Sequence, residues 1–136
     1  MPVSTHGELL GGVLLCIDDN EDVLECEKLF LESFGYTVLT APNVGTGLEL
    51  AAVYPVDVII VDYLTPEING RELVFKMRSL RPETPIIMLS GALNVPKQVL
   101  KWVDAFVAKD RLGSHLLPAI ARLHGRGQAP PPMFDS

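Results

Sequence analysis

Four short apolar runs in this chain end on residues whose side chains can take part in chemistry. The runs, with the residues that follow them, are 13–17 before Asp18 and Asp19, 56–61 before Asp62, 85–89 before Ser90, and 105–108 before Lys109. An apolar run rich in β-branched residues that stops at a polar residue predicts a buried strand ending there. Active sites of parallel α/β sheets lie at the carboxyl ends of the strands. We therefore expect these acids, the hydroxyl and the ammonium to meet at one sheet edge.

The three aspartates are candidate metal ligands. Carboxylates packed together repel one another, and burial raises their pKa values further. Mg²⁺ relieves this repulsion, because it prefers oxygen ligands, keeps several waters and needs only one or two carboxylates from the protein. The alternative is that Asp18 and Asp19 merely cap the following helix or lie in a solvated loop. The position of Asp62 at a second strand end argues against this alternative.

Asp62 is also a candidate nucleophile. A metal-bound carboxylate that faces a pocket can attack phosphorus, and the product would be an aspartyl phosphate. Negative charge that builds up on the phosphoryl oxygens must then be met by cations and hydrogen-bond donors. Lys109 offers an ammonium, and Ser90 offers a hydroxyl that can rotate to donate. Taken singly, Lys109 would be a solvated charge and Ser90 a turn residue. Neither alternative explains why both follow strands as the acids do.

Strands and helices alternate five times along the chain. Strands are expected at 13–17, 36–40, 56–61, 85–89 and 105–108, and helices at 21–34, 43–54, 69–80, 96–103 and 114–124. Short apolar strands joined by helices predict an α/β fold, with a doubly wound parallel sheet of five strands in the flavodoxin-like order 2-1-3-4-5. This order places the first and third strands side by side, so that Asp18, Asp19 and Asp62 converge.

The faces and ends of the helices follow from apolar spacing and capping residues. The spacing selects Val23, Leu24, Cys26, Leu29, Phe30 and Phe34 in the first helix, Leu73, Val74, Met77 and Leu80 in the third, and Leu116, Leu117, Ile120 and Leu123 in the last. Asn20 is a suitable N-cap for the first helix, and Gly35 is suited to end it.

The length and charge of the chain limit its class. We expect a single domain over residues 12–124, with a flexible arm at 1–11 and a disordered, proline-rich tail at 125–136. Acidic residues number 17 against 11 Lys and Arg, which gives a net charge of −6. Nucleic acids require clustered Lys and Arg, so we expect no direct nucleic acid binding.

Cysteine usage and hydropathy indicate the compartment. Cys16 and Cys26 do not predict a disulfide framework, which favours a reducing cytoplasm. No apolar run approaches membrane-spanning length, so we expect no membrane partner.

The set formed by Asp18, Asp19, Asp62, Ser90 and Lys109 resembles the receiver domain of two-component response regulators, in the CheY-like superfamily. The resemblance covers about residues 12–124, and its most specific part is the segment 58–70, VIIVDYLTPEING. It implies that Asp62 accepts a phosphoryl group from the phosphohistidine of a histidine kinase. It also implies that Asp19, Asp62 and the backbone carbonyl of Leu64 bind Mg²⁺ directly, while Asp18 acts through water.

The resemblance further implies a switch. Lys109 would pair with the phosphoryl group, and Ser90 would move toward it on activation. Phe106 takes the place of the family's switch aromatic, with plain core packing as the alternative. The charge of the added phosphoryl group would favour one of two loop arrangements. The surface that changes for a partner would be the face of the fourth helix, fifth strand and fifth helix.

The same resemblance implies the partners of the domain. They would be a sensor histidine kinase or phosphotransfer protein and an unknown output protein or effector domain, with the chain a monomer or weak homodimer. The domain would not be an enzyme beyond its own aspartyl phosphorylation and dephosphorylation.

Several positions depart from the family pattern. Asp110 stands where proline commonly follows the lysine, and Val103 and Asp104 replace the usual Ala-Gly turn in a segment that is shorter than in typical members. Trp102 in this segment is either a partner anchor or a half-buried packing residue. Leu64 stands where a side chain often faces the attacking water, and an apolar residue there predicts a long-lived phosphoryl group.

Three other functions fit the residues less well. A phosphatase of the haloacid-dehalogenase type needs a second acid two residues after the nucleophile, where Leu64 stands. A sugar- or nucleotide-binding domain would have a glycine-rich phosphate loop after the first strand, and none is present. The stronger alternative is a degenerate receiver that acts as a phosphorylation-independent protein-interaction scaffold.

Overall fold

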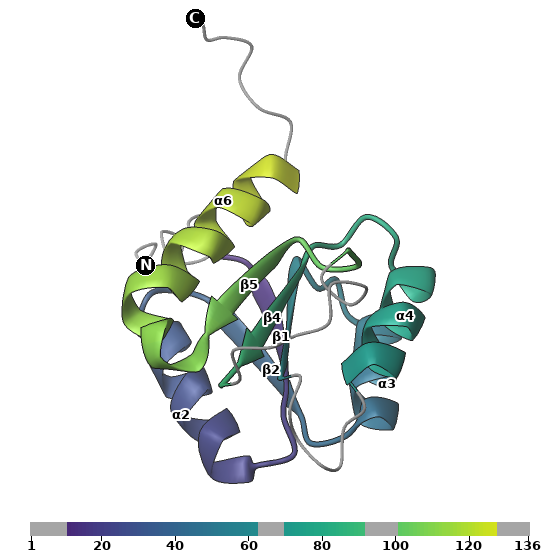
Figure 1. The fold of residues 1–136 in the computed structure, drawn as a ribbon, viewed down its shortest axis with the longest axis horizontal. Helices are drawn as coiled ribbons and strands as arrows, with labels where there is room; N and C mark the ends of the chain where they lie inside the picture. Colours follow the sequence, from purple (N-terminus) through teal and green to yellow (C-terminus); the bar gives the residue numbers. More distant parts are fainter. Residues whose placement is uncertain (1–10, 63–69, 92–100, 128–136) are drawn as a thin grey trace, which may run out of the picture.

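Five parallel strands form one sheet in the order β2-β1-β3-β4-β5 (Figure 1). The computed structural model describes residues 11–62, 70–91 and 101–127. The strands are β1 (Val13–Ile17), β2 (Thr37–Ala41), β3 (Val58–Asp62), β4 (Ile86–Ser90) and β5 (Ala105–Ala108). The fold and the strand order confirm the prediction. The predicted strand bounds agree at both ends of the chain and shift by one or two residues elsewhere.

Helices cover both faces of the sheet. They are α2 (Glu21–Glu32), α3 (Val44–Val53), α4 (Gly70–Leu80) and α6 (Leu117–Gly127). Figure 1 shows α2 and α6 on one side and α3 and α4 on the other. Side chains alternate along each strand, so β1, β3 and β4 each supply buried residues to both helical layers. The two apolar layers hold the carboxyl ends of the strands at one edge of the sheet.

Local sequence explains where α2 begins and ends. The Asn20 side chain accepts a hydrogen bond from the backbone N–H of Val23 (3.1 Å), which confirms the predicted N-cap. Gly35 has a φ of 98°, a left-handed conformation that favours glycine. This conformation turns the chain out of the helix and toward β2.

The predicted apolar face of α2 is partly wrong. The buried residues of this helix are Leu24, Glu27 and Leu31, whereas Leu29 and Phe34 are 59% and 54% exposed. Positions 24, 27 and 31 lie on one side of a helix, and this side packs against the sheet. The predicted face thus included Leu24 correctly, but it also included exposed residues and left out Leu31 and the buried carboxyl group of Glu27.

The last third of the chain also differs from the prediction. Most of the helix expected at 96–103 lies outside the described residues, and positions 101 and 102 form a turn. The helix expected at 114–124 is preceded by a short 3-10 turn, η1 (Lys109–Arg111), and a π-helical turn, η2 (Leu112–Leu116). The following helix α6 runs to Gly127, three residues beyond the expected end. Helical structure therefore begins directly at Lys109.

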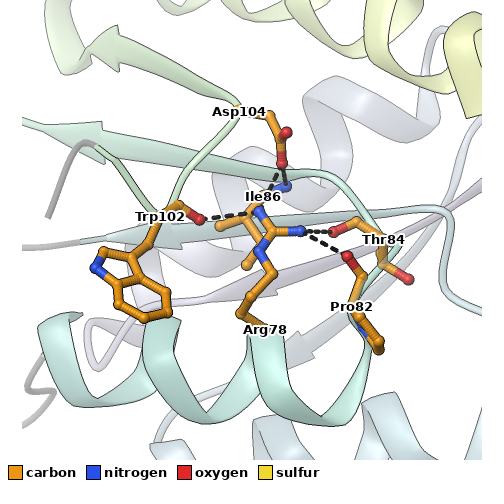
Figure 2. A network of polar contacts seen from close by, with 6 residues as sticks. All are labelled: Arg78, Pro82, Thr84, Ile86, Trp102 and Asp104. Atoms are coloured by element: carbon orange, nitrogen blue, oxygen red, sulfur yellow. Dashed lines mark hydrogen bonds and ion pairs between the residues drawn. The ribbon is translucent and has the colours of Figure 1, made fainter.

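Arg78 of α4 ties the connections before β4 and β5 together (Figure 2). Its guanidinium donates hydrogen bonds to the carbonyl oxygens of Pro82 (3.3 Å), Thr84 (3.0 Å) and Trp102 (2.9 Å) and to Asp104 Oδ2 (2.8 Å). The same Asp104 oxygen accepts the backbone N–H of Ile86 (2.8 Å). Asp104 thus fixes the start of β4 through Ile86. Asp104 itself lies just before β5, at one of the two positions that depart from the family's usual Ala-Gly turn.

Among the helices in the described part of the chain, none combines the length and apolar character needed to cross a membrane.

Candidate functional site

The strand register brings the predicted site residues to one sheet edge. Ile17 pairs with Val61, so Asp18 stands level with Asp62 across adjacent strands. Ser90 follows Leu89, the register partner of Asp62. Ser90 in turn pairs with Ala108, and Lys109 comes next in the chain. The side-by-side arrangement expected from the strand ends is therefore present.

Asp18, Asp62 and Lys109 are in contact. The Lys109 ammonium donates a hydrogen bond to Asp62 Oδ2 and lies 3.6 Å from Asp18 Oδ2. Both aspartates are buried, whereas Lys109 is partly exposed. Asp18 Oδ1 accepts the backbone N–H of Asn20 (2.9 Å), and Asp18 Oδ2 is buried with no hydrogen bond. This geometry leaves one carboxylate oxygen of the site incompletely satisfied.

The electrostatics reflect a crowded, acidic site. Burial raises the pKa of Asp18, and the neighbouring Asp62 raises it further, against smaller opposing effects of the Asn20 N–H and of Lys109. Partial burial alone would lower the pKa of Lys109. The hydrogen bond to Asp62 and the nearby negative charges outweigh burial and raise it. Lys109 is thus held as a cation beside the acids.

The residues present fit a hard divalent cation. Within the described residues, no group of three or more His, Cys, Asp or Glu side chains is arranged as a ready metal cage. Mg²⁺ does not require such a cage, since it is commonly held by one or two carboxylates and several waters. The buried Asp18 oxygen without a hydrogen bond is an acceptor suited to a cation or its bound water. Carboxylate chemistry and this unsatisfied oxygen both agree with the predicted metal.

The remaining predicted residues take different positions. Ser90 is fully buried at the end of β4, and Asp19 is partly buried after Asp18. Phe106 is 40% exposed and belongs to neither apolar core layer, so plain core packing does not account for it. Leu64, expected to supply a carbonyl ligand, lies outside the described residues.

Trp102 lies apart from this site. Its ring is 43% exposed and meets Phe75 edge to face, with the ring centroids 5.3 Å apart. Phe75 is itself exposed, so the two rings pack together at the surface, and the choice between a partner anchor and a packing residue stays a prediction.

Glu27 is a site neighbour that the sequence analysis missed. Its side chain is 6% exposed and lies on the inward stripe of α2 with Leu24 and Leu31. Burial raises the pKa of Glu27 to about 7, with a further contribution from the charge of Asp18. Its position three residues after Leu24 and four before Leu31 could have revealed it, because all three share the inward stripe.

A cavity of about 510 Å³ separates α2 from the η1 and η2 turns. Its walls include Glu27 and Phe30 from α2 and Lys109, Leu112 and Leu116 from the opposite side. Glu27 and Lys109 therefore face a common space beside the aspartates.

Comparison with known proteins identifies the class. Residues 14–118 match the family described as the response regulator receiver domain, and the chain belongs to this family. Its members are the receiver domains of two-component systems. A receiver domain protein (CheY-like) from Methanospirillum hungatei JF-1 is 28% identical, with a TM-score of 0.78 over 85% of this chain and 95% of that one.

Of two further relatives, one was solved with a bound metal and the other is a transcriptional regulator. The response regulator TrrA from Thermotoga maritima, solved in complex with Mg²⁺-BeF, is 25% identical, with a TM-score of 0.76 over 82% of this chain and 98% of that one. The cell cycle transcriptional regulator CtrA from Caulobacter vibrioides is 28% identical over 114 residues, or 82% of this chain and 48% of CtrA. The chain thus spans about half the length of the curated relatives it matches.

The CtrA match overturns the partner prediction made from charge. The acidic charge of the chain predicted no direct nucleic acid binding, yet the relative is a transcriptional regulator. Net charge describes only the residues over which it is counted. An acidic receiver that spans half of such a regulator does not exclude nucleic acid as a partner, so this prediction is wrong.

Proposed function

We propose that Asp62 accepts a phosphoryl group from a histidine kinase or a phosphotransfer protein, with Mg²⁺, and that the resulting charge switches a protein-binding face. The observation that carries the proposal is the buried Asp62 carboxylate, bonded to Lys109, beside the unsatisfied Asp18 oxygen. We also propose the cytoplasm as the compartment, since two-component receivers typically act there.

The transfer step follows from these groups. An Asp62 oxygen attacks the phosphorus of the phosphohistidine, a P–O bond forms, the P–N bond breaks, and its electron pair stays on the imidazole. Lys109 shifts from the Asp62 carboxylate to a phosphoryl oxygen, and the Ser90 hydroxyl donates to another. Attack by water on phosphorus later regenerates Asp62, so the domain catalyses only its own modification and reset.

The metal would be held by Asp19, Asp62 and the Leu64 carbonyl, with Asp18 acting through water. When bound, Mg²⁺ supplies positive charge to the phosphoryl oxygens and shields the carboxylates from one another. The relative solved with Mg²⁺-BeF supports Mg²⁺ as the metal.

The output is supported by the relatives. Movement of Ser90 and Lys109 toward the phosphoryl group would shift the connections that follow β4 and β5, next to Phe106 and α6. Because one similar protein is a cell cycle transcriptional regulator, we propose control of transcription as the process this face serves.

Intact mass after incubation with acetyl phosphate and Mg²⁺ tests the proposal. We expect a phosphoryl adduct on the wild type that requires Mg²⁺ and is lost in Asp62→Asn. Asp57→Asn is the matched control, because it changes the aspartate just before the same strand, and it should still be modified. If the wild type takes up no phosphoryl group and binds no beryllofluoride, the phosphorylation-independent scaffold is the better description.

A further inference from the structure

Glu27 is a buried acid that the fold itself does not explain. It lies on the inward stripe of α2 between Leu24 and Leu31, where a leucine would bury more apolar area and leave no polar group to satisfy. Among the described residues, the other buried polar side chains, Asp18, Asp62 and Ser90, all belong to the strand-end site. Glu27 alone of these four comes from a helix, which raises the question of what it faces.

Glu27 lies on the same face of the sheet as the phosphoryl-acceptor site. Strand alternation puts Cys16, Asp18, Asp62 and Lys109 on the same side of the sheet as α2, because Leu14, Ile60 and Val107 pack there. Glu27 and Lys109 line the same cavity. The Lys109 ammonium is hydrogen-bonded to the Asp62 carboxylate, and a second buried acid lines the cavity that Lys109 lines.

We propose that Glu27 is a positioning residue for Lys109: its ionised carboxyl draws the lysine ammonium toward α2 and away from a phosphoryl group on Asp62. The inference rests on the proposed function. Ionised Glu27 also adds a negative charge to a site that must accept an anionic donor. Both effects slow phosphoryl acceptance, and both vanish when Glu27 is protonated or replaced by a neutral side chain.

Protonation of Glu27 falls near neutral pH. The ionisable groups that act on it are Asp18 and Cys16 from β1 and its end, Asp62 from β3, and Lys109 from η1. Burial is the largest influence, and together they raise the pKa of Glu27 to about 7. The restraint on Lys109 would therefore strengthen as the pH rises through neutrality, so that Glu27 makes phosphoryl acceptance pH-sensitive.

The test compares initial rates of modification by acetyl phosphate at saturating Mg²⁺. Glu27→Gln keeps the shape of the side chain but removes the charge, and Glu27→Leu also restores an apolar stripe. Both variants should react about threefold to tenfold faster than wild type near pH 8 and converge with it near pH 6, where Glu27 is mostly protonated. Glu25→Gln, an exposed acid of the same helix, should match wild type at both pH values.

The outcomes separate this inference from the proposed function. Equal rates for wild type and both Glu27 variants, or a ratio that does not change between the two pH values, would overturn the role of Glu27 and leave Asp62 as the acceptor. A merely structural role would change the unfolding free energy without this pH-dependent split. Absence of any adduct on wild type would overturn the proposed function and the inference with it.

Discussion

The two edges of the sheet use the same residue types in opposite ways. At the amino edge, where the parallel strands begin, Asp57 stands directly before β3 and Asp104 directly before β5. Each aspartate exchanges two hydrogen bonds with a residue at the start of a neighbouring strand. Asp57 Oδ2 accepts the Val13 N–H (2.8 Å), while the Asp57 N–H donates to the Val13 carbonyl (2.8 Å). Asp104 and Ile86 repeat the pattern with the same two distances. At the carboxyl edge, where the strands end and the candidate site lies, Asp18 by contrast retains a buried oxygen without a hydrogen bond.

The difference shows how one fold separates stability from function. The Arg78 guanidinium reaches three carbonyls and a carboxylate (Figure 2), so the amino-edge network closes on itself. The carboxyl-edge cluster is held together by the surrounding apolar layers, and its acids outnumber its one lysine. A closed network stabilises the fold, whereas an acidic cluster with an unsatisfied oxygen costs stability and is suited to a cation or a phosphoryl group.

The largest expected effect comes from removing the buried acid beside the carboxyl edge. The pKa of Glu27 is raised from 4.5 to about 7, so the folded protein holds this proton more tightly than the unfolded chain does. The stability from this group is complete below about pH 4.5 and is lost as the pH rises to about 7. Glu27→Leu should therefore be more stable than wild type by about 3 kcal/mol near pH 8, with a much smaller gain near pH 4.

Urea denaturation at the two pH values measures this effect. Glu25→Leu, a substitution at an exposed position of the same helix, is the control and should show no comparable pH-dependent gain. A gain of equal size at both pH values would show that apolar packing, and not the ionised carboxyl, sets the stability of this site.

Removing the charged residue of the amino-edge network should lower the free energy of unfolding, whereas removing Glu27 should raise it. Arg78→Met removes all four hydrogen bonds of the guanidinium and leaves Asp104 without its cation, so we expect a loss of about 2 kcal/mol in the free energy of unfolding. Lys76→Met is the matched control on α4, since Lys76 forms an exposed pair with Glu72 (2.9 Å) that should contribute less than about 0.5 kcal/mol.

Denaturation together with Mg²⁺ binding decides whether the two edges are independent. Arg78→Met should bind Mg²⁺ as wild type does whenever it is folded. If the variant lost Mg²⁺ binding while remaining folded, the amino edge would be part of the functional site and the contrast between the edges would fail.

Added Mg²⁺ should stabilise the protein through the carboxyl edge and not through the amino edge. The cation should stabilise wild type by about 1–2 kcal/mol at concentrations well above its dissociation constant, because it binds the folded carboxyl edge and not the unfolded chain. Asp18→Asn should lose most of this gain, and Asp57→Asn should keep it. Thermal unfolding with and without Mg²⁺ provides the measurement, and an equal Mg²⁺ response in the two variants would argue against a site at the carboxyl edge.

Short-range patterns predicted most of what lies along the strands. The strand order and the meeting of Asp18 with Asp62 followed from apolar runs that stop at polar residues, since parallel strands bring their carboxyl ends to one edge. The inward stripe of α2 did not follow, because Glu27 is polar and a pattern of apolar residues does not select a polar position. The Arg78 network was missed because its partner Asp104 lies 26 positions along the chain.

The smallest expected effect concerns the rate at which the aspartyl phosphate at the carboxyl edge is hydrolysed. Leu64 lies outside the described residues, and the prediction rests on its position two residues after Asp62. An apolar side chain there cannot orient the water that attacks the phosphoryl group, so the aspartyl phosphate should persist. Leu64→Asn supplies a hydrogen-bonding amide and should speed the decay by roughly threefold or more. Leu64→Ala, which removes bulk without adding an amide, separates water orientation from access. Decay that is unchanged or slower in Leu64→Asn, or equally fast in Leu64→Ala, would mean that Leu64 does not limit reset by failing to orient water.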